Sequence, residues 1–296
     1  MMKLTLLGTG RMGLPMARRL CQAGHQVHVW NRSADKAQPL VADGATVHAG
    51  LATAVAAGDI VISLLENGPV VASVLFEQGA AAAMRPGTLF VDMASIKPAE
   101  AREHAARLAE RGVRHLDAPV SGGTVGAEAG TLAIMAGGEA ADFARALPVL
   151  QVLGRATHVG PHGAGQLAKL ANQMIVGITI GAVAEALLLC ERGGADAAQV
   201  REAIGGGFAQ SRILELHGER MVQRDFAPRA RMTVQLKDLR NALDTAQAMG
   251  FEAPITAALE QLYADGVAHG DSELDHSGLF VELAVAIASA VAFSAL

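Results

Sequence analysis

Near its start the chain reads Thr5-Leu6-Leu7-Gly8-Thr9-Gly10-Arg11-Met12-Gly13, an apolar run that enters the pattern G-x-G-x-x-G. Gly8 permits a tight turn, Gly10 lacks the Cβ that would keep a pyrophosphate from the backbone, and Gly13 lets the next helix pack closely on the strand. The N-terminus of that helix offers free N–H groups and the positive end of a dipole to an anion. The pattern indicates a dinucleotide site, against the alternative of a chance glycine turn in a chain with 33 glycines.

Strand-like and helical segments alternate through the first part of the chain. Residues 2–7 are strand-like and residues 14–24 read as a helix closed by glycine, which is the setting that the glycine pattern requires. Ser33 is expected to cap a helix over residues 34–43. The alternation predicts an α/β fold with a doubly wound parallel sheet of the Rossmann type. Its further strands are expected at residues 26–30, 45–48, 59–65 and 89–93.

A glycine-rich loop at residues 118–130 contains Ser121, Gly122 and Gly123. Successive glycines let backbone N–H groups converge into a concavity that binds anions, so these three residues are candidates for holding a substrate carboxylate. A flexible hairpin loop with no ligand is an equally good interpretation.

The pattern changes again at residues 160–165, a short segment with glycine and proline. Residues 166–192 then read as one long helix, and the later segments with a clear pattern are all helical. We therefore predict a dinucleotide-binding domain over residues 1–162 and an all-helical domain over residues 163–296. The later helices are expected at residues 197–204, 211–223, 232–249, 254–269 and 277–295.

The composition argues against several classes of partner. A net charge of -5 without basic clusters disfavours nucleic acid and anionic membranes. Residues 174–190 and 279–296 are apolar, but both segments are shorter than a span of about 20 apolar residues and each contains a glutamate, so buried helices explain them better. Cys21 and Cys190 lie in apolar helical patterns, which fits reduced thiols in the cytoplasm, and the start of the chain shows no secretory leader. Neither cysteines nor histidines have metal-ligand spacing, and no metal site is expected.

Lys169 is the leading catalytic candidate. It stands in the first turns of the long helix, in a chain with five lysines, and at helical spacing it shares a face with Asn172 and Gln173. A partly buried lysine beside a polarised oxygen can act as general acid and base. A solvated lysine is the alternative, although the helix dipole disfavours a cation near a helix start.

Two other groups of residues are expected to carry less chemistry. Lys237 and Asp238 are neighbours in a later helix, and because adjacent residues do not face each other on a helix we expect a surface pair without a salt bridge. The run Asp275-His276-Ser277 has the residue types of a hydrolytic triad, but a helix cap by Asp275 or Ser277 is the better interpretation.

Four separated motifs, between residue 2 and about residue 280, resemble the β-hydroxyacid dehydrogenases, the family of 3-hydroxyisobutyrate dehydrogenase, tartronate semialdehyde reductase and succinic semialdehyde reductase. They are the glycine turn continued to residue 17, and residues 117–123, 163–172 and 236–239. The chain departs from the family at Thr9, where leucine is usual, and at Arg19, where asparagine or histidine is usual. Several members have asparagine at the position of Gln173, so it stays open whether Asn172 or Gln173 contacts substrate.

The resemblance implies reversible hydride transfer between NAD(P) and a short 3-hydroxy or 4-hydroxy carboxylic acid or its semialdehyde. It implies that Lys169 is the general acid/base, assisted by Asn172, and that the helical domain builds a homodimer or homotetramer around the long helix. The candidate substrate contacts are Ser121, Gly122, Gly123 and Gln173. The candidate cofactor contacts, from the glycine pattern and the resemblance together, are Gly8, Gly10, Arg11, Met12, Gly13, Asn31, Arg32, Ser33, Leu65, Ser95 and Lys237.

Two other functions fit the same architecture. One is an imine reductase, and the other is a catalytically silent dinucleotide-binding module used in assembly. Members of both groups typically lack the lysine, so Lys169 favours a dehydrogenase, and a chain with one tryptophan and one tyrosine further disfavours an imine reductase.

The end of the second strand predicts a preference for NADP(H), with NAD(H) as the alternative cofactor. An NAD site of this fold usually has an acid about 20 residues beyond the glycines, where it accepts from the ribose 2′-OH. Here Asn31-Arg32-Ser33 stands at that place. A guanidinium pairs with phosphate through charge-assisted hydrogen bonds, and an amide and a hydroxyl can donate to the remaining oxygens. The alternative is that Arg32 only opens a surface helix.

Overall fold

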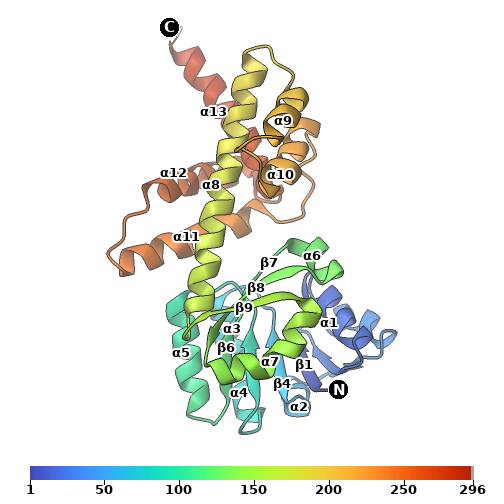
Figure 1. The fold of residues 1–296 in the computed structure, drawn as a ribbon. Coiled ribbons are helices and arrows are strands. Elements are labelled where there is room, and N and C mark those ends of the chain that lie inside the picture. Colours follow the sequence, from blue (N-terminus) through green and yellow to red (C-terminus); the bar gives the residue numbers. More distant parts are fainter. Residues whose placement is uncertain (295–296) are drawn as a thin grey trace. The chain divides into compact units, whose positions relative to one another are not determined.

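A computed structural model describes residues 1–294 of the chain, with side chains up to residue 288. The chain folds into two compact units, unit 1 from Met1 to Lys169 and unit 2 from Leu170 to Leu296, whose elements are labelled in Figure 1. The division falls inside the long helix α8 (Ala164–Arg192), which begins in unit 1 and ends in unit 2. The domain boundary expected from the sequence, between residues 162 and 163, comes just before this helix.

Unit 1 contains a nine-stranded sheet in the order β3-β2-β1-β4-β5-β6-β8-β7, with β9 paired to β8. The first six strands are parallel, β8 is antiparallel to β6 and β7, and β9 is parallel to β8. The strand order reverses at β1 and β4, the point where ligands bind in folds of this type. The strands are β1 (Lys3–Leu7), β2 (Gln26–Trp30), β3 (Thr46–Val47), β4 (Ile60–Ser63), β5 (Leu89–Asp92), β6 (Arg114–Asp117), β7 (Val120–Ser121), β8 (Leu132–Gly138) and β9 (Gly154–Gly160).

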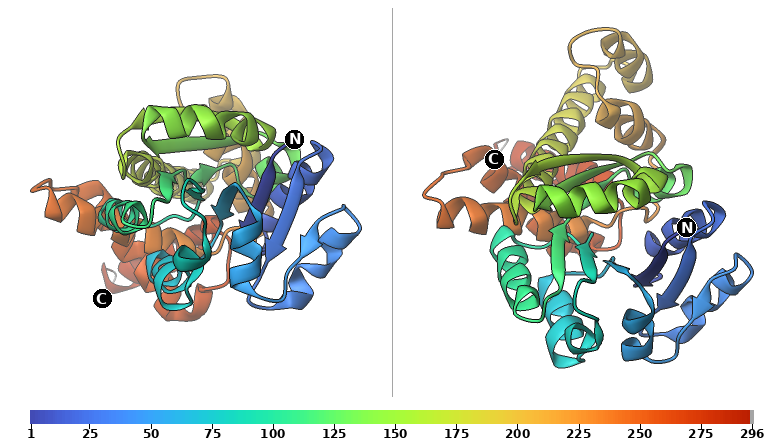
Figure 2. Two further views of the ribbon diagram at one scale, coloured as in Figure 1. Left: turned by 90° about the horizontal axis from the view of Figure 1, so that it is seen from below. Right: turned by 60° about the horizontal axis from the view of Figure 1, so that its bottom comes forward.

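Helices cover both faces of this sheet, as Figure 2 shows. Successive side chains of a strand point to opposite faces, so Leu6 packs in one core with α1 and α7, whereas Leu7 packs in a second core with α2 to α5. The predicted doubly wound α/β architecture is confirmed. The helices of unit 1, besides the start of α8, are α1 (Gly13–Gln22), α2 (Leu51–Ala57), α3 (Gly68–Ala72), α4 (Ala80–Ala83), α5 (Pro98–Ala109), α6 (Gly123–Ala129) and α7 (Ala140–Leu153).

Two segments of unit 1 have a different secondary structure from the one that the sequence predicts. The helix expected over residues 34–43 is two short 3-10 turns, Ala34–Lys36 and Gln38–Val41, and Ser33 makes no side-chain cap; Pro39 lacks the N–H that a continuous helix needs. The segment predicted as a glycine-rich loop contains β7 and the helix α6, which begins after Gly122 and ends before Gly130.

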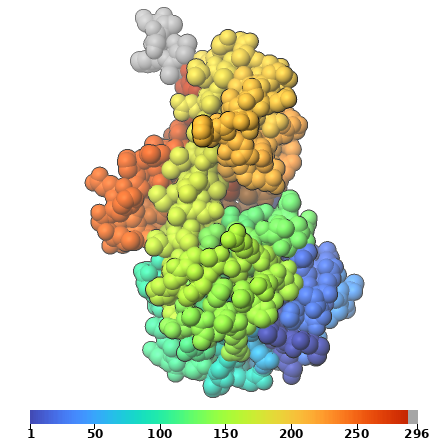
Figure 3. Space-filling model, in the orientation of Figure 1, coloured from blue at the N-terminus to red at the C-terminus, as the bar shows by residue number. Residues whose placement is uncertain are grey.

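Residues 140–160, for which the sequence analysis proposed no element, form α7 and β9. Pro148 lies inside α7 and weakens its helical signal. One face of α7 covers the sheet and the other face is exposed. The exposed face of α7 is turned toward the viewer in Figure 3.

Unit 2 is helical over the part of it that the structure describes, as the sequence predicts. Side chains of α8 such as Ile180 and Leu187 form its core with Tyr263 and Leu279. The prediction for the last helix extends to Ala295, which lies outside the described residues. The helices after α8 are α9 (Ala197–Gly205), α10 (Arg212–Gln223), α11 (Met232–Ala248), α12 (Pro254–Gly266) and α13 (Leu279–Ser294).

On length and composition alone, α8 is apolar enough to cross a membrane. The apolar segment 174–190 that we assigned to a buried helix is thus part of a longer helix of 29 residues. One face of α8 contributes Ile180, Ala184 and Leu187 to the core of unit 2, as the sequence analysis expects, whereas Ile175 and Leu189 are 67% and 73% exposed.

Candidate active site

The glycine turn after β1 has the close backbone packing that its pattern predicts. Gly8 has a φ of +96°, and a Cβ on it would lie 2.6 Å from the carbonyl oxygen of Leu64. A Cβ on Gly13 would lie 1.9 Å from the carbonyl oxygen of Gly8, whereas a Cβ on Gly10 would meet nothing within 4 Å. The backbone at Gly10 therefore faces open space at the start of α1, and a pyrophosphate fits there.

Four candidate cofactor contacts follow the carboxyl ends of neighbouring parallel strands. Gly8 follows β1, Asn31 follows β2, Leu65 comes shortly after β4, and Ser95 shortly after β5. The register pairs Leu7 with Trp30 and with Ser63, and Ser63 with Asp92, so these strands end at one level. Unit 1 thus gathers these candidates at the carboxyl ends of its parallel strands, together with Arg11 and Met12 of the glycine turn, whereas the candidate Lys237 belongs to unit 2.

Asn31 holds the glycine turn in place. Its Oδ1 accepts the N–H of Thr9 at 3.0 Å, and its Nδ2 donates to the carbonyl oxygen of Ser33 at 2.9 Å. The amide expected to donate to a 2′-phosphate is therefore engaged within the chain. Arg32 is exposed and takes part in no hydrogen bond or ion pair within residues 1–288, so its guanidinium is available to a ligand.

Asp92 is a buried acid at this edge that the sequence analysis missed. Its Oδ1 accepts from the hydroxyl of Ser63 at 2.7 Å and from the N–H of Ala94 at 3.1 Å, and its Oδ2 is buried without a hydrogen-bond partner among the described side chains and backbone. Burial raises the pKa of Asp92 to about 7, and the nearby Asp117 and Glu100 add to this effect. A neutral carboxyl costs less free energy to leave partly unpaired than a carboxylate does.

This shift in pKa predicts how stability depends on pH. Unfolded, Asp92 ionises near its ordinary value of 3.8, but the folded protein keeps the proton to about pH 7. Proton binding at Asp92 therefore stabilises the folded protein fully below about pH 4, and this contribution is lost as the pH rises to about 7. Asp92→Asn keeps the Oδ1 acceptor and removes the titration. The difference in free energy of unfolding between the variant and wild type should therefore shift in favour of the variant by roughly 2–4 kcal/mol between pH 4 and pH 7.5. Urea unfolding of both proteins across this range measures the effect, and parallel pH profiles would contradict it.

The proposed carboxylate-binding residues lie where β7 meets α6. Ser121 ends β7, and Gly122 and Gly123 have positive φ angles of +137° and +62°. The side chain of Arg19 on α1 donates to the carbonyl oxygen of Glu128 in α6 at 3.0 Å and to that of Val152 in α7 at 3.1 Å. Arg19 thus connects the cofactor helix α1 with the end of α6.

Lys169 is 8% exposed and lies near the start of α8, in the same unit as the glycine turn, Ser95 and Ser121. A lysine so deeply buried is uncommon unless it is paired or functional. The alternative of a solvated lysine is therefore wrong.

Asn172, Gln173 and Lys237 belong to unit 2, where Gln173 takes part in a buried polar network. Its Nε2 donates to Gln235 at 3.1 Å and to Asp238 at 2.7 Å, and its Oε1 accepts from Asn172 at 2.9 Å. Both ends of the Gln173 amide are engaged in the network. Asn172 is less buried and is the better candidate for a substrate contact.

The prediction of a surface pair at Lys237 and Asp238 is wrong. The Nζ of Lys237 lies 3.1 Å from Oδ1 of Asp238, and Asp238 is only 2% exposed. The other carboxylate oxygen of Asp238, Oδ2, accepts from Nε2 of Gln173. Sequence spacing alone cannot show that a remote residue orients the carboxylate.

The remaining candidates are structural. Asp275 accepts from the N–H of Ser277 and caps the 3-10 turn His276–Gly278, which comes before α13, whereas the sequence predicted a cap of the last helix itself; Asp275 also pairs with Arg220 at 2.8 Å. No group of three or more histidine, cysteine or acidic side chains is placed to hold a metal ion within the described part of the chain.

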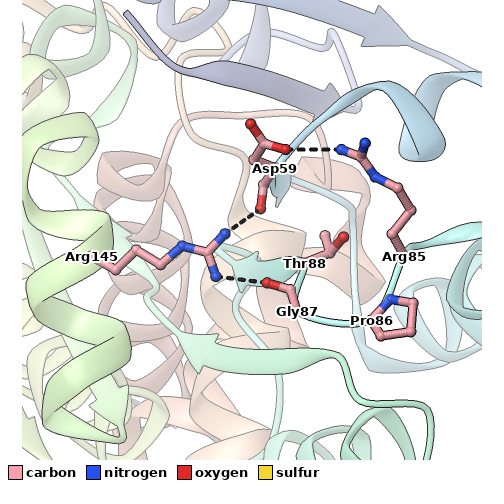
Figure 4. A pocket seen from close by; sticks show the side chains of 6 residues that line it. All are labelled: Asp59, Arg85, Pro86, Gly87, Thr88 and Arg145. Carbon is pink, nitrogen blue, oxygen red and sulfur yellow. Dashed lines mark hydrogen bonds and ion pairs between the residues drawn. The ribbon is translucent and has the colours of Figure 1, made fainter.

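A cavity of about 290 Å³ lies at the opposite, amino ends of β4 and β5, and Figure 4 shows its lining. Arg145 on α7 donates to the carbonyl oxygens of Asp59 and Gly87 at 3.0 and 2.7 Å, and Arg85 pairs with Asp59 at 2.8 Å. These contacts connect α7 to the sheet. The cavity lies at the opposite end of the strands from the glycine turn.

Comparison with known proteins places these features in a family context. Residues 3–160 match the family described as the NAD binding domain of 6-phosphogluconate dehydrogenase, and residues 163–283 match the NAD-binding domain of NADP-dependent 3-hydroxyisobutyrate dehydrogenase.

Individual relatives match over nearly the whole chain. The 2-hydroxy-3-oxopropionate reductase of Escherichia coli is 45% identical over 94% of this chain and 96% of its own length, and the 3-hydroxyisobutyrate dehydrogenase of Pseudomonas aeruginosa is 37% identical over 94% and 96%. The structure of Mycobacterium tuberculosis 3-hydroxyisobutyrate dehydrogenase with L-serine is similar, with a TM-score of 0.88 and 35% identity over 96% of this chain and 99% of that chain.

Proposed function

Because the chain belongs to the β-hydroxyacid dehydrogenase family, we propose that it interconverts a short 3-hydroxy or 4-hydroxy carboxylic acid and its semialdehyde, with NADP(H) as the preferred cofactor. The identity to the reductase of E. coli makes 2-hydroxy-3-oxopropionate the first substrate to test. The observation that supports the proposal most strongly is the burial of Lys169 in the unit that also holds the glycine turn and Ser121.

The proposed roles follow from the chemistry of the side chains. The bound nicotinamide cofactor supplies or accepts the hydride at the substrate carbon. In the direction of reduction Lys169 donates a proton to the carbonyl oxygen as it becomes a hydroxyl, and in oxidation it takes that proton back. The hydroxyl of Ser121 and the N–H groups of Gly122 and Gly123 bind the carboxylate.

A homodimer or homotetramer is part of the same proposal. Ile175 and Leu189 are exposed on α8, and an apolar side chain in water is stabilised when a second subunit covers it.

The carboxylate contact leads to a direct test of this function. We expect turnover of 2-hydroxy-3-oxopropionate or another semialdehyde acid, such as succinic semialdehyde, with NADPH. The methyl ester of the best substrate should lose about 10- to 100-fold in kcat/KM, because charge-assisted hydrogen bonds contribute about 1.5–3 kcal/mol. Steady-state assays of acid, ester and simple aldehyde measure this.

Ser121→Ala provides the matched variant, since it should lower kcat/KM for the acid substrate and leave kcat/KM for the ester nearly unchanged. Equal kcat/KM for acid and ester would rule out the carboxylate contact. Turnover of a cyclic imine, with none of any semialdehyde, would instead support the imine reductase alternative.

A further inference from the structure

Asp117 and Gln166 hold the first turn of α8, and both are fully buried in unit 1. Asp117 ends β6, where its Oδ1 accepts the N–H of Gly163 at 2.8 Å and its Oδ2 accepts the N–H of Gln166 at 2.9 Å. N–H groups at a helix start have no partner inside the helix, so one carboxylate satisfies two of them at the positive end of the dipole. We call Asp117 and Gln166 the α8 clamp.

The side chain of Gln166 connects the same turn to the loop after β5. Its Oε1 accepts the N–H of Ile96 at 3.0 Å, and its Nε2 donates to the carbonyl oxygen of Ala94 at 2.8 Å. These two bonds flank Ser95, a candidate cofactor contact. The α8 clamp therefore joins β6, the loop after β5 and the start of α8 into one hydrogen-bonded assembly.

Two glycines allow close backbone packing in this assembly. A Cβ on Gly165 would lie 2.4 Å from the carbonyl oxygens of Asp117 and Met135, and a Cβ on Gly137 would lie 2.6 Å from the N of Gly165. The first turn of α8 thus lies directly on the backbone of β6 and β8, without side chains between them. Such contact leaves the helix start little freedom to shift or tilt.

We propose that the α8 clamp positions Lys169 for proton transfer, with Asp117 and Gln166 acting through that lysine. The inference rests on the proposed function, in which Lys169 is the general acid/base. Lys169 follows Gln166 by less than one helical turn, so a displacement of the first turn moves its side chain directly. A displacement of about 1 Å can cost about 100-fold in rate, because proton transfer needs a close and aligned contact.

The first arm of the test examines the clamp without reference to activity. Amide hydrogen exchange of the cofactor-free protein would be measured on peptides covering residues 163–170. Asp117→Asn keeps one acceptor oxygen but turns an amide NH2 toward the other N–H group, so exchange there should speed up about tenfold or more, and Asp117→Ala should speed it up further. Asp142→Asn is the matched control, since Asp142 is a buried acid of unit 1 whose hydrogen bonds go to Arg114.

The second arm measures the consequence for catalysis. Per folded enzyme, Asp117→Asn should lower kcat about 10- to 100-fold and leave the KM for the cofactor within about twofold, as expected for a reacting group that is misplaced in an intact cofactor site. Asp142→Asn should keep its kcat. If Asp117 variants do not fold, Gln166→Glu removes the donor to Ala94, keeps an acceptor for Ile96, and should give the same pair of effects.

Two results would overturn the inference: unchanged exchange at residues 163–170, or faster exchange with an unchanged kcat. Lys169→Ala, measured alongside, separates this from the proposed function. A Lys169→Ala enzyme with wild-type kcat would refute the role of the lysine, whereas a loss of kcat in Lys169→Ala without a loss in Asp117→Asn would refute only the positioning.

Discussion

Lys169→Ala should lower kcat by about 100- to 10000-fold, the range over which general acid/base groups usually act. The affinity for NADP(H) should stay nearly unchanged, because Lys169 is not among the residues proposed to bind the dinucleotide, which lie in the glycine turn, after β2, β4 and β5, and at Lys237 in α11. A loss confined to kcat identifies an interaction made in the transition state. Stopped-flow or steady-state kinetics, with cofactor titration by fluorescence, measures both quantities.

Lys3→Ala is the matched control, because Lys3 is an exposed lysine of the same unit at the start of β1. It should retain wild-type kcat. Lys169→Arg tests the chemistry further, since a guanidinium stays protonated and cannot shuttle the proton, so it should be nearly as impaired as the alanine variant. A Lys169→Ala enzyme with kcat near that of wild type would remove the lysine from the mechanism.

Much of unit 1 could be predicted because local physics specifies it. The glycine turn needs Gly8 and Gly13 for close backbone contacts, and both contacts appear in the structure. The apolar strands need cover on both faces, and two cores supply it. The failures are also local in origin: Pro39 breaks the expected helix over residues 34–43 into two 3-10 turns, and the glycines that predicted a loop at 118–130 also begin and end α6.

Candidate site residues could be proposed from the sequence where a residue would act by its own chemistry, and less so where it would act through a distant partner. Lys169 could be singled out from its type and its place in a helix. The pairing of Asp117 with Gly163, and that of Gln166 with Ala94, joins residues 46 and 72 positions apart, and no spacing rule reaches so far. The hydrogen bond from the N–H of Thr9 to Asn31 could not be predicted from spacing either, and the sequence pattern assigned Asn31 only to the cofactor.

The preference for NADP(H) should depend on Arg32. Arg32→Ala should reduce the ratio of kcat/KM for NADPH to that for NADH by about 10- to 100-fold, because a charge-assisted hydrogen bond to the 2′-phosphate contributes about 1.5–3 kcal/mol. Two features at the end of β2 favour this preference. No acid stands there to repel a phosphate, and the guanidinium of Arg32 is exposed, whereas the amide of Asn31 is engaged with Thr9 and Ser33.

Two variants and one pair of inhibitors isolate this contact. Arg32→Lys keeps the charge and loses the planar fork, so it should fall between wild type and Arg32→Ala. Lys36→Ala removes an exposed cation close by in sequence and should leave the cofactor ratio within about twofold of wild type if the guanidinium, not the general field, reads the phosphate. Competition by 2′,5′-ADP against 5′-AMP examines the adenosine end alone, and Arg32→Ala should weaken only the first. A wild-type enzyme that favours NADH, or an Arg32→Ala enzyme that keeps its NADPH preference, would show that Arg32 does not read the 2′-phosphate.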